Sequence, residues 1–372
     1  MRRPRPWLKR PEDSSKVSSL TRLFFDARYI RPDFHDGISR FSANLFAALS
    51  RKIDITAIIS DERQLASLPT GTKWVRLHAP TSALEPLSSL LLKKHKPDLV
   101  FSPMQTIGSF GKKFKLILTV HDLIYYRHPK PPGYLNPLIR LGWRLFHLSY
   151  VPERILLRGA DAVATVSETT KRELRTHRLT RRSIAVVYNA PERSAKPLSV
   201  GARTALKKLV YMGTFMPYKD VETLIRGVAR LEGFELELLS RIDDRRRIEL
   251  TALAEEVGAN VSFRNGVTDE EYAAALDSAT ALVTASRDEG FGIPIVEAMV
   301  RGVPVIVSDI PIFREVAGDV GVFFTPGDSG DFAKKVQETV KRPQSAKNLM
   351  KQATRFDWDK SADELLKLIA SL

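Results

Sequence analysis

Cysteine is absent from this 372-residue chain, which excludes disulfide bonds and thiolate metal sites. No uninterrupted apolar run reaches the length of about 18 residues that would predict a membrane-spanning helix. The N-terminus is basic but lacks the apolar segment of a secretion signal. These absences predict a cytoplasmic protein.

Two function classes lose support because their motifs are missing. No G-x-G-x-x-G follows the first predicted strand, which argues against a dinucleotide oxidoreductase. No zinc-finger, RRM or KH pattern is present, which argues against a nucleic-acid-binding protein despite the basic composition. We therefore expect no nucleic-acid partner.

Length and periodicity favour an α/β protein with two domains. The chain is longer than a single core usually supports, and 43% hydrophobic and 8% aromatic residues are typical of soluble α/β proteins. Apolar segments at 23–30, 53–59, 98–102 and 115–120 predict strands that alternate with helical segments, the first of them over 38–49. Such alternation predicts a parallel sheet.

The most informative segment is 281–325, which reads as strand, loop, helix and strand. Strands are predicted over 281–286 and 303–307, and Pro294 can start the helix between them. Glu289 lies in the glycine-bearing loop, and Glu297 follows eight positions later, in the expected first turn of that helix. Open parallel sheets bind ligands at the carboxyl ends of their strands. The pair suits a sugar nucleotide, with one carboxylate for the ribose diol and one beyond the phosphates, although acidic residues also occur near helix starts by chance.

Two further polar residues follow predicted strands. His121 comes directly after the apolar segment LILTV, where a histidine is either structural or a site residue. Lys219 lies between the strand LVYMG and a helix expected to start near Val221, where an ammonium and a helix N-terminus would form an anion site. The alternative for Lys219 is a solvated surface side chain.

These motifs, in this order, resemble the E-x7-E group of retaining glycosyltransferases with the GT-B fold, the large family four that uses sugar nucleotides. The resemblance covers roughly residues 23–372 and includes segments at 36–41, 121–129, 160–174, 184–192 and 211–225. Within the E-x7-E segment the matching residues are Ser286, Glu289, Gly290, Phe291, Gly292, Pro294, Glu297, Ala298, Gly302, Pro304 and Val305.

The resemblance implies an α/β GT-B architecture, with two Rossmann-like doubly wound parallel-sheet domains facing across a cleft. A C-terminal helix is expected to cross back to the first domain. The implied division is a basic disordered tail over 1–22, an acceptor-side domain over 23–193, a nucleotide-sugar domain over 194–354 and the crossover helix over 355–372.

The resemblance also assigns roles. It implies Glu289, His121 and Lys219 as catalytic residues of a retaining hexosyltransferase, with Glu289 positioning the donor sugar. No metal and no cofactor are implied, since Lys219 and a helix dipole would neutralise the diphosphate of the sugar-nucleotide donor. The implied donor-binding residues are Gly37, Gly213, Thr214, Arg241, Gly290, Phe291, Gly292, Ile293 and Glu297.

The sequence departs from the family at two positions. Thr214 stands where many members carry a second cation, an arginine, after the loop glycine; a Gly-Thr subgroup includes many mannosyltransferases. Asn189-Ala190 stands where Asn-Gly is usual. The first departure favours mannose from GDP-mannose as donor, leaves UDP-sugars and other GDP-sugars open, and makes a catalytically silent scaffold or glycan-binding subunit the main alternative.

Charge is concentrated in two segments. The formal net charge is +15, of which residues 1–22 carry +5 and residues 111–182 carry +10. Within 135–160, arginines are interleaved with leucine, isoleucine, phenylalanine and tryptophan, a composition typical of a lipid interface. The alternative is a surface helix packed on its own domain. We expect a glycan or lipid-linked acceptor from cell-envelope glycan synthesis and peripheral binding at the inner face of the plasma membrane.

Overall fold

The computed structural model describes residues 22–33, 36–129, 131, 137–191 and 207–372. The tail expected over 1–22 lies outside these residues except for Arg22. The domain boundary expected at 193 also lies outside the described residues.

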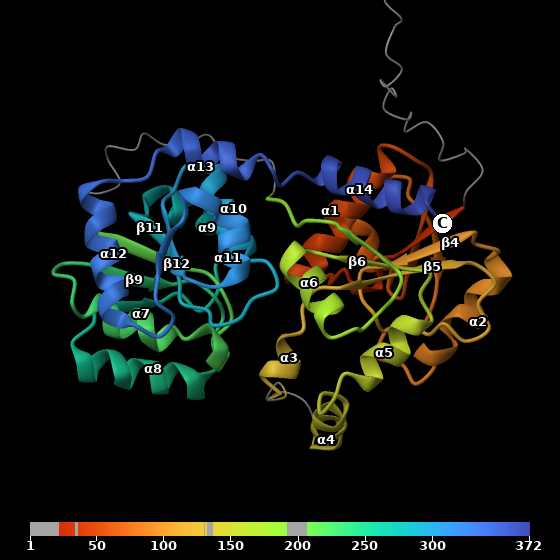
Figure 1. The fold of residues 1–372 in the computed structure, drawn as a ribbon, viewed down its shortest axis with the longest axis horizontal. Helices are drawn as coiled ribbons and strands as arrows, with labels where there is room; N and C mark the ends of the chain where they lie inside the picture. The colour runs from red at the N-terminus through yellow and green to blue at the C-terminus, as the bar shows by residue number, and fades with distance from the viewer. Residues whose placement is uncertain (1–21, 34–35, 130, 132–136, 192–206) are drawn as a thin grey trace, which may run out of the picture.

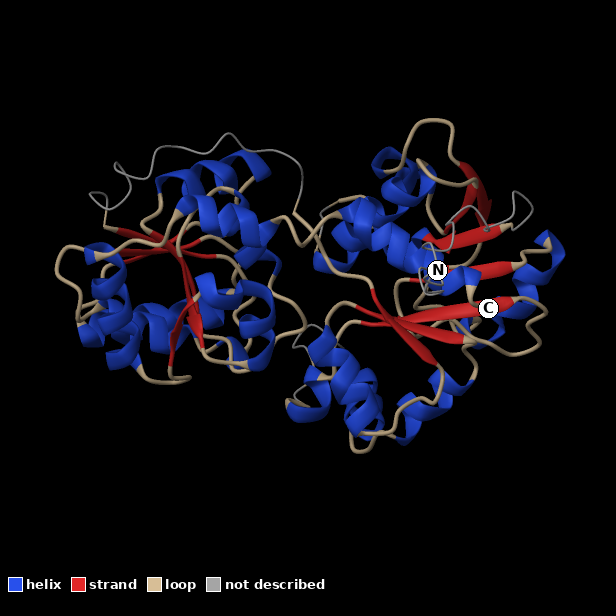
Figure 2. Ribbon diagram, turned by 45° about the horizontal axis from the view of Figure 1, so that its top comes forward, coloured by secondary structure: helices blue, strands red, loops and turns tan. Residues whose placement is uncertain are grey.

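The first part of the chain builds a parallel sheet of seven strands in the order β3-β2-β1-β4-β5-β6-β7. Helices lie on both faces of this sheet (Figures 1 and 2). Its strands are β1 (Leu23–Asp26), β2 (Ile55–Ile59), β3 (Lys73–Arg76), β4 (Leu99–Ser102), β5 (Lys115–Val120), β6 (Ala162–Thr165) and β7 (Ser183–Val186). The helices are α1 (Gly37–Ser50), α2 (Ser88–Leu92), α3 (Ile124–Arg127), α4 (Pro137–Phe146), α5 (Val151–Arg158) and α6 (Glu168–Thr176).

The second part builds a parallel sheet of six strands in the order β10-β9-β8-β11-β12-β13. Its strands are β8 (Lys208–Tyr211), β9 (Glu235–Leu238), β10 (Val261–Phe263), β11 (Ala281–Thr284), β12 (Val305–Ser308) and β13 (Val322–Phe324). Its helices are α7 (Val221–Val228), α8 (Asp244–Val257), α9 (Asp269–Ser278), α10 (Ile293–Val300), α11 (Pro311–Ala317), α12 (Ser329–Lys341) and α13 (Ala346–Ala353).

The predicted fold class is confirmed, because both sheets are parallel and doubly wound. In each sheet the order reverses at the first strand, between β1 and β4 and between β8 and β11. The central strands are buried apolar runs, as expected for strands covered on both faces. The loops at the carboxyl ends beside these reversal points are where ligands bind in open α/β sheets.

The first strand is shorter than the prediction over 23–30. Strand β1 ends at Asp26, whose carboxylate accepts a hydrogen bond from the Arg28 backbone N–H and caps the 3-10 turn Ala27–Tyr29. The buried Arg28 guanidinium is paired with Asp26 at 2.7 Å and with Glu85 at 2.8 Å. This local charge network turns the chain where the apolar pattern alone suggested a longer strand.

The C-terminal helix α14 (Trp358–Ala370) returns to the first sheet's domain and packs on α1 and β7 (Figure 1). The Ser361 hydroxyl donates to the Tyr188 carbonyl at 2.7 Å, and the rings of Trp358 and Phe41 lie 5.9 Å apart. The helix begins at Trp358, within the predicted range 355–372, because the Asp357 carboxylate caps it.

Apolar contacts also join the two halves of the molecule. The Phe291 ring, at the start of the α10 segment, lies 5.4 Å from Phe356 and 6.1 Å from Tyr188. All three belong to or pack against one hydrophobic cluster that contains residues of both domains. This cluster holds the carboxyl ends of the two sheets facing each other.

Candidate functional site

A cavity of about 550 Å³ lies between the carboxyl ends of the two sheets. Loops that follow β1, β5, β8 and β11 supply most of its walls, which agrees with the ligand position expected for this topology. The cavity brings together ten of the twelve predicted site residues: His121, Lys219, Glu289, Gly37, Gly213, Thr214, Gly290, Phe291, Gly292 and Ile293.

Lys219 and Glu289 form an ion pair inside this cavity, between the Lys219 Nζ and a Glu289 carboxylate oxygen. The side chains are only 12% and 20% exposed. Lys219 ends a 3-10 turn (Pro217–Lys219) that leads into α7, and Glu289 lies in the loop before α10. Of the described residues that line the cavity, Lys219 is the only lysine or arginine, so the cavity places one fixed cation beside one fixed carboxylate.

Two helices direct their N-terminal ends at the cavity. Asp36, Gly37 and Ile38, at the start of α1, line one wall, and Gly292 and Ile293, at the start of α10, line another. Gly292 has φ +93°, a left-handed conformation that side-chain-bearing residues rarely adopt. Helix N-termini carry partial positive charge and free N–H groups, so both favour an anionic ligand.

His121 contributes a neutral imidazole. Its Nε2 lies 2.8 Å from the Pro103 carbonyl oxygen, and since a carbonyl can only accept, Nε2 carries the proton. The ring packs edge-on against Phe41 at 5.0 Å, and burial lowers the pKa of His121 below its ordinary value. An imidazole held in this way offers Nδ1 as a hydrogen-bond acceptor rather than a positive charge.

Gly290 brings the second domain's backbone against Asp122 of the first. A Cβ added at Gly290 would lie 3.0 Å from an Asp122 carboxylate oxygen and 3.2 Å from the His121 carbonyl oxygen. Burial, together with the charges of Glu289 and Asp288, raises the pKa of Asp122 to about 6, although the Ile124 N–H donates to it at 3.0 Å. Glycine is therefore needed here for close approach of the two domains.

Glu297 lies elsewhere than predicted. It is the fifth residue of α10 and so occupies the second turn, not the first, because the helix begins at Ile293 rather than Pro294. Its carboxylate accepts a hydrogen bond from the Tyr272 hydroxyl at 2.9 Å. It lines a smaller cavity of about 310 Å³ beside the later residues of the same helix, shared with Arg40, Asp269 and Arg301.

Arg241 follows β9 but is not among the residues that line the central cavity, so its donor-binding role stays a prediction. It is exposed, and its aliphatic chain packs over Gly266, where an added Cβ would lie 2.8 Å from the Arg241 Cγ. Thr214 does line the central cavity, and the described residues that line this cavity include no lysine or arginine besides Lys219.

Sequence reasoning missed the polar contacts that join the domains. Arg127 of α3 holds Asp288, the neighbour of Glu289, with nitrogen–oxygen distances of 2.5 and 2.7 Å. Glu315 of α11 accepts hydrogen bonds from the first backbone N–H groups of α6 at 2.7 Å and from the Tyr188 hydroxyl at 3.1 Å. A glutamate that caps a helix of another domain leaves no local sequence signal, because its partners lie about 150 residues away.

Comparisons with known proteins agree with this architecture. Residues 35–192 match the family model described as Glycosyltransferase Family 4, and residues 194–356 match the model described as Glycosyl transferases group 1. The chain thus belongs to the family-four glycosyltransferases, and it is an enzyme of that class resembling mannosyltransferases.

The curated relatives include several mannosyltransferases. The O-antigen chain mannosyltransferase RfbU of Salmonella typhimurium is 25% identical over 343 residues, covering 87% of this chain and 92% of the relative. The serotype-specific mannosyltransferase WbdA of Escherichia coli is 28% identical over 177 residues, which is 45% of this chain but only 22% of that protein.

Solved structures share the fold at low identity. Sucrose-phosphate synthase from Thermosynechococcus elongatus superposes with a TM-score of 0.73 at 18% identity, covering 94% of this chain and 98% of that one. HepE of Anabaena, solved in complex with UDP and glucose, gives 0.72 at 18% identity, covering 95% and 100%. At this identity the likeness establishes the GT-B fold alone.

Two features are absent from the described residues. No helix among them is long and apolar enough to cross a bilayer. In the same part of the chain, no group of three or more histidine, aspartate or glutamate side chains is arranged to hold a metal ion.

Proposed function

We propose that this protein transfers a hexose, best matched to mannose from GDP-mannose, to a glycan or lipid-linked acceptor with retention at the anomeric carbon. The observation that carries the proposal is the Lys219–Glu289 pair within a cavity that two helix N-termini face. The mannosyltransferase relatives support the choice of sugar. HepE, whose structure holds UDP and glucose, leaves UDP-glucose as the second donor to test.

The diphosphate of the donor would lie against Lys219 and the N-terminal ends of α1 and α10. In the transfer, the acceptor oxygen forms a bond to C1 of the sugar while the bond from C1 to the diphosphate oxygen breaks. The leaving diphosphate keeps the electron pair and takes the proton of the acceptor hydroxyl. Charge develops on the diphosphate, and a preorganised ammonium and helix N-termini stabilise that charge without a metal ion.

Glu289 fits a positioning role better than a nucleophilic one. Its carboxylate is already neutralised by the Lys219 ammonium, which lowers the electron density available for attack on C1. Retention then arises by attack of the acceptor on the face that the diphosphate leaves. The His121 Nδ1 would accept a hydrogen bond from a hydroxyl of the donor sugar.

The nucleoside would extend along α10 toward the smaller cavity. Glu297 and Tyr272 there present a carboxylate and a hydroxyl to a ribose diol. A carboxylate can accept two hydrogen bonds from vicinal hydroxyl groups in a charge-assisted pair. This arrangement keeps the ribose role proposed for Glu297, although the residue lies one turn further along the helix.

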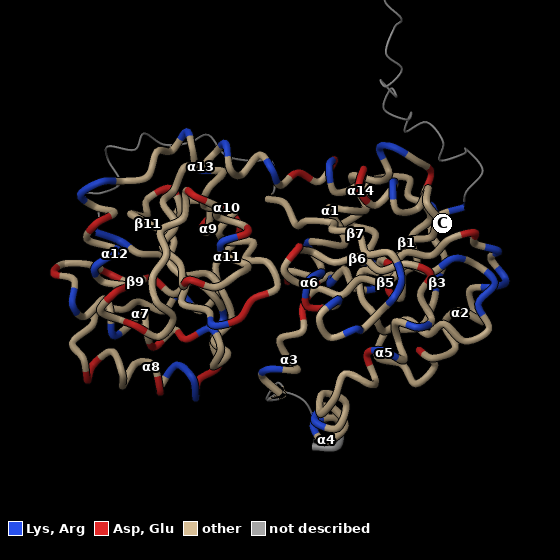
Figure 3. Tube along the Cα trace, viewed as in Figure 1, with Lys and Arg blue, Asp and Glu red and all other residues tan. Residues whose placement is uncertain are grey.

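Peripheral membrane binding is the second half of the proposal. Along α4 and the segment after it, Leu141, Leu145 and Leu148 are exposed, Leu148 to 76%, while Trp143 faces a cavity instead. Two arginines, Arg140 and Arg144, belong to the same helix, and Figure 3 colours such positions of the chain trace blue at α4. Exposed leucines beside arginines suit an anionic lipid surface.

A donor panel tests the transfer. Purified protein is incubated with GDP-mannose, UDP-glucose or UDP-galactose, each with and without EDTA, and the nucleoside diphosphate released as the sugar is slowly transferred to water is measured. We expect release from GDP-mannose that EDTA leaves unchanged. Release that stops with EDTA and returns with Mg²⁺ or Mn²⁺ would contradict the metal-independent mechanism.

Vesicle sedimentation tests the membrane half. We expect binding to phosphatidylglycerol vesicles and not to phosphatidylcholine vesicles, with loss of binding in the Leu141→Asp, Leu145→Asp double variant. Equal sedimentation with both lipids would contradict an electrostatic contribution.

A further inference from the structure

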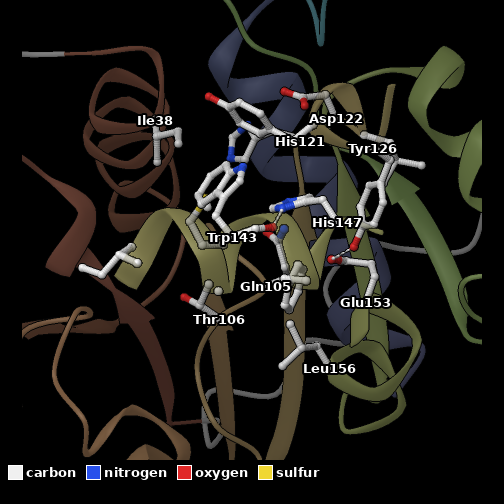
Figure 4. A pocket seen from close by; sticks show the side chains of 16 residues that line it. Ile38, Gln105, Thr106, His121, Asp122, Tyr126, Trp143, His147, Glu153 and Leu156 are labelled. Carbon is white, nitrogen blue, oxygen red and sulfur yellow. Dashed lines mark hydrogen bonds between the residues drawn. The ribbon is translucent and has the colours of Figure 1, made fainter. Parts of the chain in front are cut away.

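A second cavity, of about 620 Å³, lies within the first domain next to the central cavity. The two share Ile38, His121, Asp122 and Tyr125 as a common wall. The second cavity extends from there between the loop after β4 and helices α3, α4 and α5 (Figure 4). Its volume lies within the range of about 300–1,000 Å³ that is typical of small-molecule sites.

Aromatic rings form much of its wall. The Trp143 indole lies 4.7 Å from the Tyr125 ring, edge to face, and 4.6 Å from the His147 ring. Tyr126 lies 5.0 Å from His147. Such rings offer flat apolar faces to a ligand that has an apolar face of its own.

Three polar atoms in this wall lack partners among the described residues. They are Gln105 Oε1, Trp143 Nε1 and Glu153 Oε1, each buried and without a hydrogen bond. Glu153 is only 1% exposed, and its other oxygen accepts a hydrogen bond from the Tyr126 hydroxyl at 3.3 Å. Figure 4 shows the side chains of Gln105, Trp143, His147 and Glu153 gathered around the same space.

The unpartnered atoms restrict the ligand. A buried polar group without a hydrogen bond destabilises the structure by about 1–3 kcal/mol. A purely apolar chain in this cavity would leave all three groups without a hydrogen bond. Two of the atoms are acceptors when Glu153 is ionised, and the third is a donor. Burial raises the pKa of Glu153 to about 7, so its carboxyl group can also donate near neutral pH. Hydroxyl groups, which donate and accept, match this set.

We propose that this cavity is an acceptor subsite that takes a pyranose residue of the acceptor glycan, with the sugar's C–H face on the rings and its hydroxyl groups on Glu153, Gln105 and Trp143. This inference rests on the proposed function, since the shared wall at His121 and Asp122 would bring the bound residue beside the donor sugar. The exposed leucines of α4 would then hold the protein at the membrane surface, where any lipid portion of the acceptor would remain.

Binding of simple pyranosides tests the proposal without knowledge of the natural acceptor. Methyl α-D-mannopyranoside, methyl α-D-galactopyranoside and methyl α-L-rhamnopyranoside are titrated into the full chain, and binding is followed by saturation-transfer NMR. We expect at least one to bind saturably, with Kd raised tenfold or more by Glu153→Leu and restored to within about threefold by Glu153→Gln. Glu256→Leu, an exposed glutamate of α8, is the control and should leave Kd unchanged.

The outcomes separate this proposal from the proposed function. Nucleotide binding is measured on each variant and should be unaffected by Glu153→Leu, which also shows that the variant is folded. Failure of all three pyranosides to bind, or binding that ignores Glu153→Leu, would overturn the subsite. A change in fluorescence with dodecyl phosphate but with none of the pyranosides, if it disappears in Trp143→Phe, would overturn the subsite in favour of a site for an alkyl chain. Absence of nucleotide binding in the wild type would count against the donor site and not against this subsite.

Discussion

Replacement of Lys219 by methionine removes the cation that we assign to the leaving diphosphate. Two unit charges about 4 Å apart interact by about 1 kcal/mol in water and about 4 kcal/mol at the effective dielectric constant near a protein surface. Lys219 is 12% exposed in a cavity that offers no other lysine or arginine among the described residues, so we place the loss at about 3 kcal/mol. This corresponds to roughly a 100-fold fall in kcat/KM for the donor.

The assay is release of nucleoside diphosphate from the preferred sugar nucleotide, with unfolding by denaturant as a check on folding. Lys208→Met is a matched control, because Lys208 lies at the amino end of β8, whereas the cavity lies at the carboxyl ends of the strands. Lys208 pairs with Glu237 at 3.5 Å. Glu237 keeps Arg264 as a partner at 2.8 Å when Lys208 is replaced. We expect that control to retain activity within about threefold. A Lys219→Met variant that is folded and as active as Lys208→Met would refute the charge argument.

Three further predictions concern the same site. Glu297→Ala should raise the nucleotide Kd about tenfold in calorimetry, whereas Glu289→Ala should leave Kd unchanged and lower kcat about 100-fold; identical effects of the two would contradict their separate roles. Gly290→Ala should lower kcat about tenfold with nucleotide binding retained, because its Cβ would meet Asp122 at 3.0 Å, and normal turnover would be inconsistent with close approach there. Asp122→Asn should raise the free energy of unfolding by up to about 3 kcal/mol at pH 7.5. The reason is that the folded pKa of Asp122, about 6, lies above that of an ordinary aspartate. The stability of the wild type therefore falls as pH rises from about 4 to 6. At pH 4 that gain should vanish, and a gain equal at both pH values would rule out titration of Asp122 as its cause.

The sequence predicted the parts of the site that depend on short segments. Glu289, Lys219 and His121 each follow a buried apolar strand, and in a parallel sheet such positions meet at one edge. The family resemblance that these motifs carry then implied that the two domains face each other across a cleft. Ten of the twelve predicted residues line one cavity for this reason.

The error at Glu297 has a local cause. Glu297 was expected in the first helical turn because proline is common at the first helical position, whereas here Pro294 is the second residue and Gly292 is the N-cap. Arg241 follows β9, and its aliphatic chain lies against Gly266 outside the central cavity, so no local pattern indicates whether it reaches a donor.

Contacts between distant segments were beyond the reach of sequence patterns. The Arg127–Asp288 pair and the Glu315 cap of α6 join residues more than 140 positions apart. The cavity around Glu153 also depends on how α4 and α5 fold back toward β5, which the continuous amphipathic pattern over 135–160 did not reveal. One side of that segment lines the cavity, and the other exposes its leucines. The lipid-interface interpretation of that pattern stays a prediction.

The central claim is that the cavity binds a nucleoside diphosphate sugar without a metal ion. The most direct test is thermal unfolding of the wild type with GDP, UDP, ADP and their sugars, each with and without EDTA. A ligand at one hundred times its Kd stabilises the folded state by about 2.7 kcal/mol, and we predict this for GDP and GDP-mannose with no effect of EDTA and with a smaller shift in Lys219→Met. No stabilisation by any nucleotide would contradict the account and favour a domain that binds glycans without transferring sugar.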